Sequence, residues 1–462
     1  MTLVAPLAIF WIAALALALA DGRQRSVGVL GLAALLAGLV AMVRLTLEVV
    51  ALGPIVMVAG NWPAGVGISL RADALGVAFA LTAIAVLLVA YGFELAGGIE
   101  SRSFPALTLF LAAGLTGVFI TGDAFNFYVF FEIAMVASYV LTAYGEERRQ
   151  LRAAVIFAVV NLLGSVIFLI GIVSLYHTTG SLDMVSIAAR MPIVEENPAV
   201  VTGTLLLVAL GVKLGIFPFH FWLPAVYTGV HSSVAAMLSG ALAIIGAYGL
   251  LRIGAGMLPR ELDLSAPVLI ALGVASILYG GLLSISRHDP AAVVAYSAIG
   301  QVGYILIAVA IGGAVGYGAA ILFTIWNSMN KTLLFLSGGQ LNRYAGIAYA
   351  VGGLSVAGIP PVGGFWGKTA VLRATLIADG QITRAFLAAI VVIGGGLSLL
   401  YMFQSYGRTY WAVPGGPRDG SARARTGIVV LLAVLIVVLG VWPEPLLALS
   451  DQAALIFEAP TP

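Results

Sequence analysis

Long apolar runs recur along this chain from one end to the other, and they constrain its fold more than any other feature. Of its 462 residues, 61% are apolar and 9% are charged, whereas a soluble protein carries roughly 25% charged residues. The shortage of charge extends over the whole length, which argues against a soluble domain with one anchor. We therefore expect an all-α integral membrane protein, because helices satisfy their own backbone hydrogen bonds in lipid.

About fourteen runs approach the length of roughly twenty apolar residues that one bilayer crossing requires. The predicted spans, numbered one to fourteen in chain order, are 3–20, 27–43, 73–95, 105–120, 124–144, 152–176, 200–222, 231–252, 265–286, 290–312, 316–341, 346–378, 384–407 and 426–447. Between Leu52 and Arg71, two prolines and several glycines predict an external loop or a short hairpin.

The arginines of the loops predict the orientation of the chain in the membrane. Twelve arginines lie at loops that follow odd-numbered spans, against seven at the remaining loops and adjoining helix ends. Because cytoplasmic loops carry the excess of basic residues, we expect the odd-numbered loops in the cytoplasm and both termini outside.

Composition also excludes several functional classes. The chain has no cysteine, which excludes disulfides, thiolate catalysis and iron–sulfur clusters held by cysteine. Its four histidines show no metal-ligand spacing, so we expect no metal site and no cofactor. A net charge of +2 gives no reason to expect nucleic acid as a partner.

Two predicted spans are interrupted by glycine and proline in related ways. Span seven contains Gly211-Val-Lys-Leu-Gly-Ile-Phe-Pro218, and span twelve contains Gly358-Ile-Pro-Pro-Val-Gly-Gly-Phe-Trp-Gly-Lys368. Freed backbone groups at membrane depth are tolerated only inside protein or beside a wet cavity, and paired broken helices point to a transport site. The predicted helix breaks lie at Pro218, Pro224, Pro360 and Pro361.

The spacing of these breaks predicts the domain organisation. Because they lie five spans apart, we expect two five-helix repeats, spans four to eight (105–253) and nine to thirteen (265–408). Three N-terminal spans (1–104) precede the repeats, and span fourteen (426–447) follows them.

Four charged residues fall where the membrane should exclude them. All three lysines of the chain, Lys213, Lys331 and Lys368, lie in predicted spans. Glu132 lies ten residues beyond Gly122, or about 15 Å along a helix and thus near mid-bilayer. Ionisable residues in a membrane are functional by default, so we predict a relay for protons or other monovalent cations. For any one of them alone, a structural ion pair or a snorkelling side chain is the alternative.

His220 is a further candidate, because it follows Lys213 by about two helical turns. Either a proton-relay role or a role in capping the broken helix fits its position. Asp123, at the start of span five, is interpreted as a helix cap.

These motifs resemble the antiporter-like subunits shared by respiratory complex I and Mrp-type multisubunit cation/proton antiporters, and within that family the D subunits of Mrp antiporters most of all. Three stretches carry the resemblance: Thr121-Gly-Asp-Ala-Phe-Asn-Phe-Tyr-Val-Phe-Phe-Glu132, Gly211 to Pro224, and Ala357 to Lys368. The stretches 330–339 and 295–303 add support.

The resemblance implies a fold and a role for each buried charge. The two five-helix repeats would be inverted, each with a half-channel and a broken helix. Glu132 and Lys213 look like the ion pair of helices five and seven. Lys331 looks like the buried lysine of helix eleven, and Lys368 like the terminal lysine of broken helix twelve.

One departure from the family pattern interrupts the implied relay. Ile244 occupies the place of the usual lysine or histidine of helix eight, and Phe323 and Asn327 stand near the usual histidines of helix eleven. Either water or the side chains of polar residues fill the gap in helix eight, or the subunit conducts through only one half. The polar candidates are Ser239, Tyr248 and His231.

The function implied is that of a proton-conducting subunit of an Mrp-type Na⁺(cation)/H⁺ antiporter, not an enzyme by itself, in the bacterial cytoplasmic membrane. Its partners would be other membrane subunits, the lipid bilayer, protons and monovalent cations. Three alternatives stay open. They are a proton-pumping subunit of a complex I-like NADH:quinone oxidoreductase, a proton-coupled subunit for inorganic-carbon uptake, and a non-conducting scaffold. The sequence shows no oxygen-rich cation cage that would select sodium.

Overall fold

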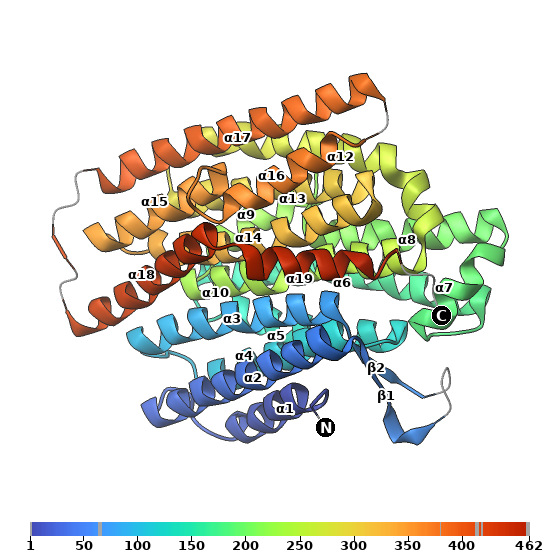
Figure 1. Ribbon diagram of the computed structural model, residues 1–462. Coiled ribbons are helices and arrows are strands. Elements are labelled where there is room, and N and C mark those ends of the chain that lie inside the picture. Colours follow the sequence, from blue (N-terminus) through green and yellow to red (C-terminus); the bar gives the residue numbers. More distant parts are fainter. Residues whose placement is uncertain (1, 63–66, 379, 412–414, 417–418, 459–462) are drawn as a thin grey trace.

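The computed structural model describes residues 2–62, 67–378, 380–411, 415–416 and 419–458. Over these residues the chain is almost entirely helical, and most of the helices run roughly alongside one another in one bundle (Figure 1). Ten helical stretches of this part are long and apolar enough to cross a membrane. The prediction of an all-α membrane protein is confirmed.

Every predicted span contains a helix. The first six are α1 (Ala5–Ala18), α2 (Arg25–Leu52), α3 (Ala74–Gly97), α4 (Phe104–Ile120), α5 (Ala124–Thr142) and α6 (Arg148–Thr179). Span seven consists of α8 (Glu196–Leu214), a 3-10 turn (Phe219–Phe221) and α9 (Trp222–Gly229). Span eight consists of α10 (Ser232–Ala236), a π-helical segment (Met237–Leu242), α11 (Ile244–Gly249) and a second π-helical segment (Leu250–Ala255).

The second half follows the same prediction. Its helices are α12 (Pro259–Ile285), α13 (Pro290–Ile311), α14 (Gly313–Gly338), α15 (Arg343–Ala357), α16 (Gly364–Thr375), α17 (Gln381–Tyr410) and α18 (Gly420–Val441). Two short helices, α7 (Met184–Arg190) and α19 (Glu444–Leu455), lie outside the predicted spans or at the margin of one. Two further 3-10 turns are Ala59–Asn61 and Met191–Ile193.

The stretch between Leu52 and Arg71 contains a short hairpin, one of the two predicted alternatives. Strands β1 (Ile55–Val58) and β2 (Ser69–Ala72) pair antiparallel. In Figure 1 the hairpin projects at the right end of the bundle. The strands lead directly into Asp73, whose side chain caps the start of α3 by accepting a hydrogen bond from the backbone of Gly76.

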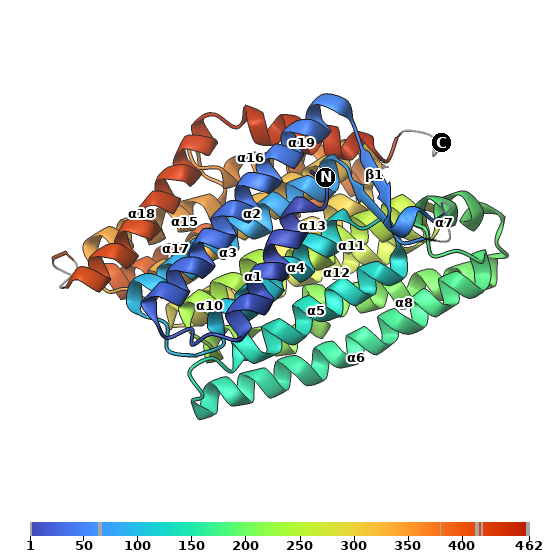
Figure 2. The same cartoon turned by 90° about the horizontal axis from the view of Figure 1, so that it is seen from below.

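Helices near the centre of the bundle differ in burial from those at its edge. Helix α3, the stretch Ser232–Ala255, α13 and α14 are buried on most sides, which matches their nearly uniform apolar or small-residue sequences. In contrast, α2, α6, α12, α17 and α18 each expose a broad apolar face. Figure 2 shows α6 along one edge of the bundle and α18 at another. The outer helices therefore present the surface that a lipid bilayer would contact.

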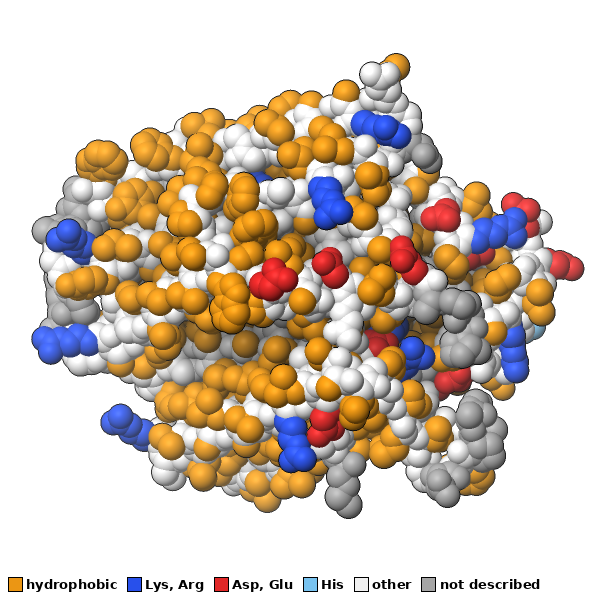
Figure 3. Space-filling view, in the orientation of Figure 1, with side chains coloured by type: hydrophobic (Ala, Val, Ile, Leu, Met, Phe, Trp, Pro, Cys, Tyr) orange, Lys and Arg blue, Asp and Glu red, His pale blue; other side chains and the backbone are white. Residues whose placement is uncertain are grey.

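Charged side chains are distributed unevenly between the two ends of the bundle. In the face shown in Figure 3, the charges at the left end are basic, whereas carboxylates lie toward the middle and right. This distribution agrees with the arginine excess of the odd-numbered loops. The predicted orientation, with both termini outside, remains a prediction.

Candidate functional site

The two broken helices end in the same way. Helix α8 ends at Leu214 and is capped by Gly215, and α15 ends at Ala357 and is capped by Gly358. Both glycines have left-handed backbone angles, with φ of 69° and 84°, a conformation that glycine adopts at little cost. The breaks predicted from glycine and proline therefore form, and each places backbone carbonyl groups at the interior of the bundle.

Three of the four predicted prolines lie within these breaks. Pro218 lies between α8 and α9, and Pro360 and Pro361 lie between α15 and α16. Pro224 instead occupies the third position of α9 and so follows the break rather than making it. A proline is tolerated there because the first N–H groups of a helix have no partner inside that helix.

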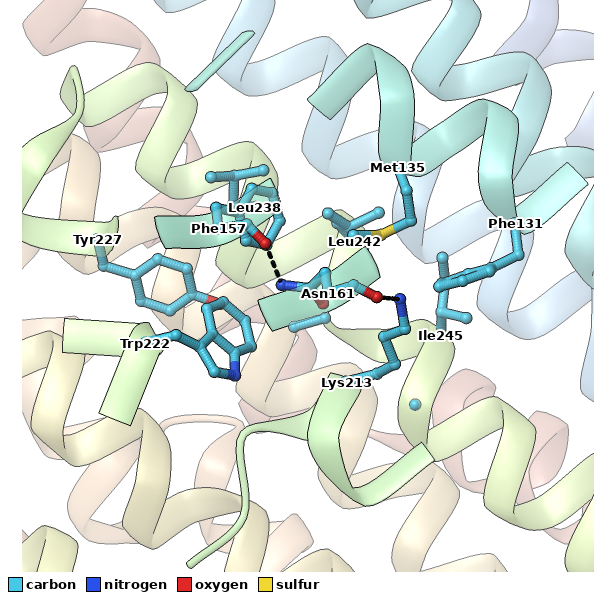
Figure 4. Close-up of a pocket in the computed structure, with 12 residues that line it drawn as sticks. Phe131, Met135, Phe157, Asn161, Lys213, Trp222, Tyr227, Leu238, Leu242 and Ile245 are labelled. Carbon is cyan, nitrogen blue, oxygen red and sulfur yellow. Dashed lines mark hydrogen bonds between the residues drawn. The ribbon is translucent and has the colours of Figure 1, made fainter. Parts of the chain in front are cut away.

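Lys213 lies in the last turn of α8, directly before the first break. Its Nζ donates hydrogen bonds to the backbone oxygen of Asn161, at 2.7 Å, and to Oγ of Ser165, at 2.8 Å. The ammonium group also lies 4.2 Å from the centre of the Phe131 ring. Figure 4 shows the lysine directed from α8 toward Asn161 of α6. All of these partners are neutral.

Glu132 lies on α5, next to the aromatic ring that Lys213 contacts. Its side chain is half-buried, and its buried Oε1 has no hydrogen-bond partner among the described residues. No ion pair within 4.0 Å joins Glu132 to Lys213 in the described part of the chain; Lys213 is held by α6 instead. The two groups are therefore not at ion-pair distance in this structure, and their pairing stays a prediction.

A small cavity lies beside Lys213 (Figure 4). The volume within which the centre of a water molecule fits is about 20 Å³. On this measure, about 10–15 Å³ suffices for one water molecule. Its walls are mostly apolar and include Phe131, Met135, Trp222 and Ile245. The cavity is therefore large enough to hydrate the lysine with one water, and it is bounded on one side by span eight.

In the second half, Lys368 is part of a cluster of hydroxyl and amide groups. Its Nζ, on α16, donates to the backbone oxygen of Ala357 and to Oγ of Ser398, both at 3.3 Å. Ser398 also accepts a hydrogen bond from Oη of Tyr401 at 3.1 Å and one from Nε2 of Gln301 at 3.4 Å. These contacts join α13, α16 and α17 around the second break.

Lys331, on α14, lies at the other end of this cluster. Its Nζ donates to Oγ of Ser297 and, at 3.2 Å, to the backbone oxygen of Val294. Ser297 and Gln301 are four residues apart on α13 and thus lie on one face of that helix. One face of α13 therefore connects the surroundings of the two lysines in the second half.

A second cavity, of about 10 Å³ on the same measure, adjoins Lys368. Asn327 and Asn330 line it, and in each the buried Oδ1 lacks a hydrogen-bond partner among the described residues. Buried polar atoms are normally satisfied by protein or by water, so this space suits about one water molecule. Phe323, which stands near the place of a usual family histidine, also lines the cavity and stacks on Tyr304.

Three of the residues expected to support the relay in span eight have partners elsewhere. Oγ of Ser239 donates to the backbone of Ala235 in its own helix, at 2.7 Å. Oη of Tyr248 donates to the backbone of Phe119 and accepts from Nε of Arg252, both at 3.0 Å. His231 occupies the residue before α10, without a capping hydrogen bond from its side chain, and lies 4.0 Å from the carboxylate of Glu100. None of the three lines either cavity.

His220 and Ile244 are both buried. The His220 ring lies against the rings of Phe217 and Tyr279, with centres 5.5 and 4.4 Å apart. Its buried Nδ1 has no partner within the described residues. Ile244 does not line the Lys213 cavity, although its neighbour Ile245 does. The side of span eight that faces Lys213 is therefore apolar.

Sequence reasoning missed a buried ion pair between the start of α3 and span eight. Nη1 and Nη2 of Arg252 donate to the two carboxylate oxygens of Asp73 at 2.7 and 2.6 Å. Burial by itself would raise the pKa of Asp73. The charge and hydrogen bonds of Arg252, the charge of Arg71 and the hydrogen bond from Gly76 together outweigh burial and lower that pKa to about 2. The sequence did contain one indication of this pair: Arg252 lies at the end of an apolar span rather than in a loop.

Glu94, near the end of α3, is a second buried carboxylate that the sequence did not single out. It accepts hydrogen bonds from Oη of Tyr144 at 2.8 Å and from Oγ of Ser233 at 2.7 Å. Among the described residues no group of three or more histidines, cysteines or carboxylates is placed to hold a metal ion.

Comparison with known proteins identifies the family. The family model described as NADH:quinone oxidoreductase/Mrp antiporter, transmembrane, matches residues 121–398. The chain is 30% identical over 423 residues to the D subunit of the Na⁺/H⁺ antiporter of Bacillus subtilis, an alignment that covers 86% of this chain and 84% of that protein. It is 28% identical over 442 residues to the D subunit of the Na⁺/H⁺ antiporter of Alkalihalophilus pseudofirmus, covering 90% and 89%.

Solved structures agree with this identification. A chain of the Mrp complex from Dietzia superposes with a TM-score of 0.89 at 26% identity, covering 98% of this chain and 96% of that one. A chain of respiratory complex I from Thermus thermophilus has the same fold, with a TM-score of 0.84 at 23% identity and full coverage of both. The chain thus belongs to the NADH:quinone oxidoreductase/Mrp antiporter transmembrane family.

Proposed function

We propose that this chain is the proton-conducting subunit of an Mrp-type multisubunit Na⁺/H⁺ antiporter of the bacterial cytoplasmic membrane. The names of its relatives and the likeness to a chain of an Mrp complex support this assignment. The observation that carries it is that each broken helix places a buried lysine against neutral oxygen atoms and beside a cavity of about the size of a water molecule.

The chemistry of such a lysine suits proton transfer. An ammonium group that is buried without a counter-ion is costly, so its protonation responds to any charge that approaches it. Closure of Glu132 onto Lys213 would stabilise the protonated lysine, and separation would favour release of the proton. Two groups coupled in this way titrate as one unit. Lys331 and Lys368 would then pass the proton through the cluster around Ser398.

The family resemblance also implies how the repeats of this chain and the other subunits are arranged. The two five-helix repeats, 105–253 and 265–408, would be inverted relative to each other and would each provide a half-channel. Other membrane subunits of the antiporter would pack against this chain, and a monovalent cation would be exchanged for the proton elsewhere in the assembly or along this path.

Cation-driven proton exchange in everted vesicles that contain the whole complex tests the proposal. Addition of Na⁺ should dissipate an imposed pH gradient with the wild-type chain and should fail to do so with Glu132→Ala. Assembly of the complex must be shown for both. Glu94→Gln is the matched control, because it alters a buried carboxylate that lies outside the proposed relay. Exchange that survives Glu132→Ala intact would refute the proposal.

A further inference from the structure

An apolar groove runs between α8 and α12 on the outside of the bundle. The two helices lie side by side at the right of Figure 1 and both begin at the same end of the bundle. The volume of the groove within which the centre of a water molecule fits is about 280 Å³. Its lining consists mainly of aliphatic side chains, and Leu264 and Val268 are more than half exposed. In a membrane this groove opens to lipid.

One charged group lines the groove. Glu261, in the first turn of α12, is only 7% exposed, yet it borders the groove. Over the described residues, no side chain donates a hydrogen bond to its carboxylate or lies within ion-pair distance of it; the adjacent Arg260 pairs with Glu196 instead, at 3.3 Å. The carboxylate oxygens of Glu261 are not fully buried: they reach the groove, whose apolar wall offers them little solvation. No positively charged group of the described residues therefore pairs with the Glu261 carboxylate where it faces the groove.

The other polar groups of the groove are already satisfied. Oγ1 of Thr204 donates to the backbone of Val200, and Oγ of Ser265 donates to the backbone of Leu262, each within its own helix. The remaining wall is apolar as far as Leu272 and Phe219, which lie beside the first helix break. From Glu261 to Leu272 the groove extends for roughly 16 Å along α12, about the depth of one bilayer leaflet.

We propose that this groove binds one phospholipid with a primary ammonium headgroup, such as phosphatidylethanolamine. The ammonium group would bind the carboxylate of Glu261, and one acyl chain would lie along the aliphatic wall of α8 and α12. The guanidinium of Arg260, on the residue before Glu261, is half exposed and pairs with the exposed carboxylate of Glu196; on lipid binding it would exchange that carboxylate for the lipid phosphate. The two charges of the headgroup thus meet two charges of opposite sign on consecutive residues.

This site extends the proposed function but does not depend on it, because lipid binding is measured without transport. The whole complex would be reconstituted in nanodiscs that contain equal amounts of phosphatidylethanolamine and phosphatidylglycerol. Native mass spectrometry would then count the lipids that remain bound after release. The wild type should retain more phosphatidylethanolamine than phosphatidylglycerol. Glu261→Gln should reduce that preference about tenfold, as expected for loss of a charge-assisted hydrogen bond.

Two further variants keep the test decisive. Glu195→Gln, which alters an exposed carboxylate at the same end of α8, should leave the preference unchanged. Val268→Trp fills the groove from its exposed side without touching the core, and should displace the lipid even if Glu261→Gln does not assemble. An unchanged lipid count and headgroup preference in both Glu261→Gln and Val268→Trp would overturn the proposal.

A neighbouring subunit is the competing occupant of the groove. Because the chain has no cysteine, Val268→Cys can carry a single photoreactive probe. Labelling of lipid supports the proposal, whereas labelling of another subunit in the intact complex overturns it.

Discussion

The two broken helices hold their lysines in different surroundings. Lys213 binds two oxygens of a single helix, α6, beside a cavity with mostly apolar walls. Lys368 binds oxygens from two segments, α15 and α17, and its serine partner also binds a tyrosine and a glutamine. Two related helix breaks therefore produce two kinds of site. In the proposed relay, proton transfer in the first half would require water and movement of Glu132, whereas in the second half a network of side chains is already in place.

Span eight separates these two environments. Toward Lys213 it presents Leu238, Leu242 and Ile245, and its polar side chains, which could have bridged the halves, bind elsewhere. At one end, Arg252 anchors it to Asp73, the residue before α3. In the proposed relay, a connection between the halves would have to cross this apolar span, which the Arg252–Asp73 pair holds in place.

Loss of the anchor should give the largest effect on stability. Asp73→Asn leaves Arg252 buried without its counter-ion, and removal of one partner of a buried pair costs about 3–5 kcal/mol. We expect a clearly lower thermal unfolding temperature for the purified complex. Arg71→Gln is the matched control, since Arg71 contacts the same carboxylate at 3.2 Å but is more exposed, and it should cost less. Equal, small losses in both variants would contradict the anchoring role.

Acid should weaken the same anchor. Because the pKa of Asp73 is about 2 in the folded protein, below the ordinary value of 3.8, its contribution to stability is complete above pH 4 and is lost as the pH falls toward 2. The shift corresponds to about 2 kcal/mol. Thermal unfolding measured from pH 5 to pH 2 should show this loss in the wild type, and Asp73→Asn should remove that part of the pH dependence.

The serine partners of the two lysines give the most direct comparison between the halves. Ser398→Ala removes the centre of the second network and should slow exchange in everted vesicles about tenfold, near the effect of one lost charge-assisted hydrogen bond. Ser165→Ala removes a partner of Lys213, but water in the adjacent cavity can replace it, so we expect a smaller effect of about twofold.

Ser405→Ala is the control for this pair, because it alters another buried serine of α17 that binds Tyr349 outside the network. It should exchange at the wild-type rate. If Ser165→Ala slowed exchange more than Ser398→Ala, the contrast between the halves would be reversed.

Much of this arrangement could be predicted from local sequence. Apolar runs specify the spans, and glycine and proline within two of them specify the breaks before Pro218 and Pro360, because these effects act over neighbouring residues. The three lysines are also recognisable from local sequence, because each lies within an apolar run. Pairings between distant residues could not be predicted: Arg252 and Asp73 are 179 residues apart. Nor could the partners of Tyr248 or the separation of Glu132 from Lys213, since both depend on how the helices pack.

We propose that both broken-helix lysines carry protons although their surroundings differ. Side-by-side measurement of cation-driven proton exchange for Lys213→Ala and Lys368→Ala, in everted vesicles with the complete complex, tests it most directly. We predict that each substitution abolishes exchange while the complex still assembles. Exchange that persists in Lys368→Ala would show that the second half is dispensable for conduction, and exchange that persists in both variants would show that neither lysine carries protons.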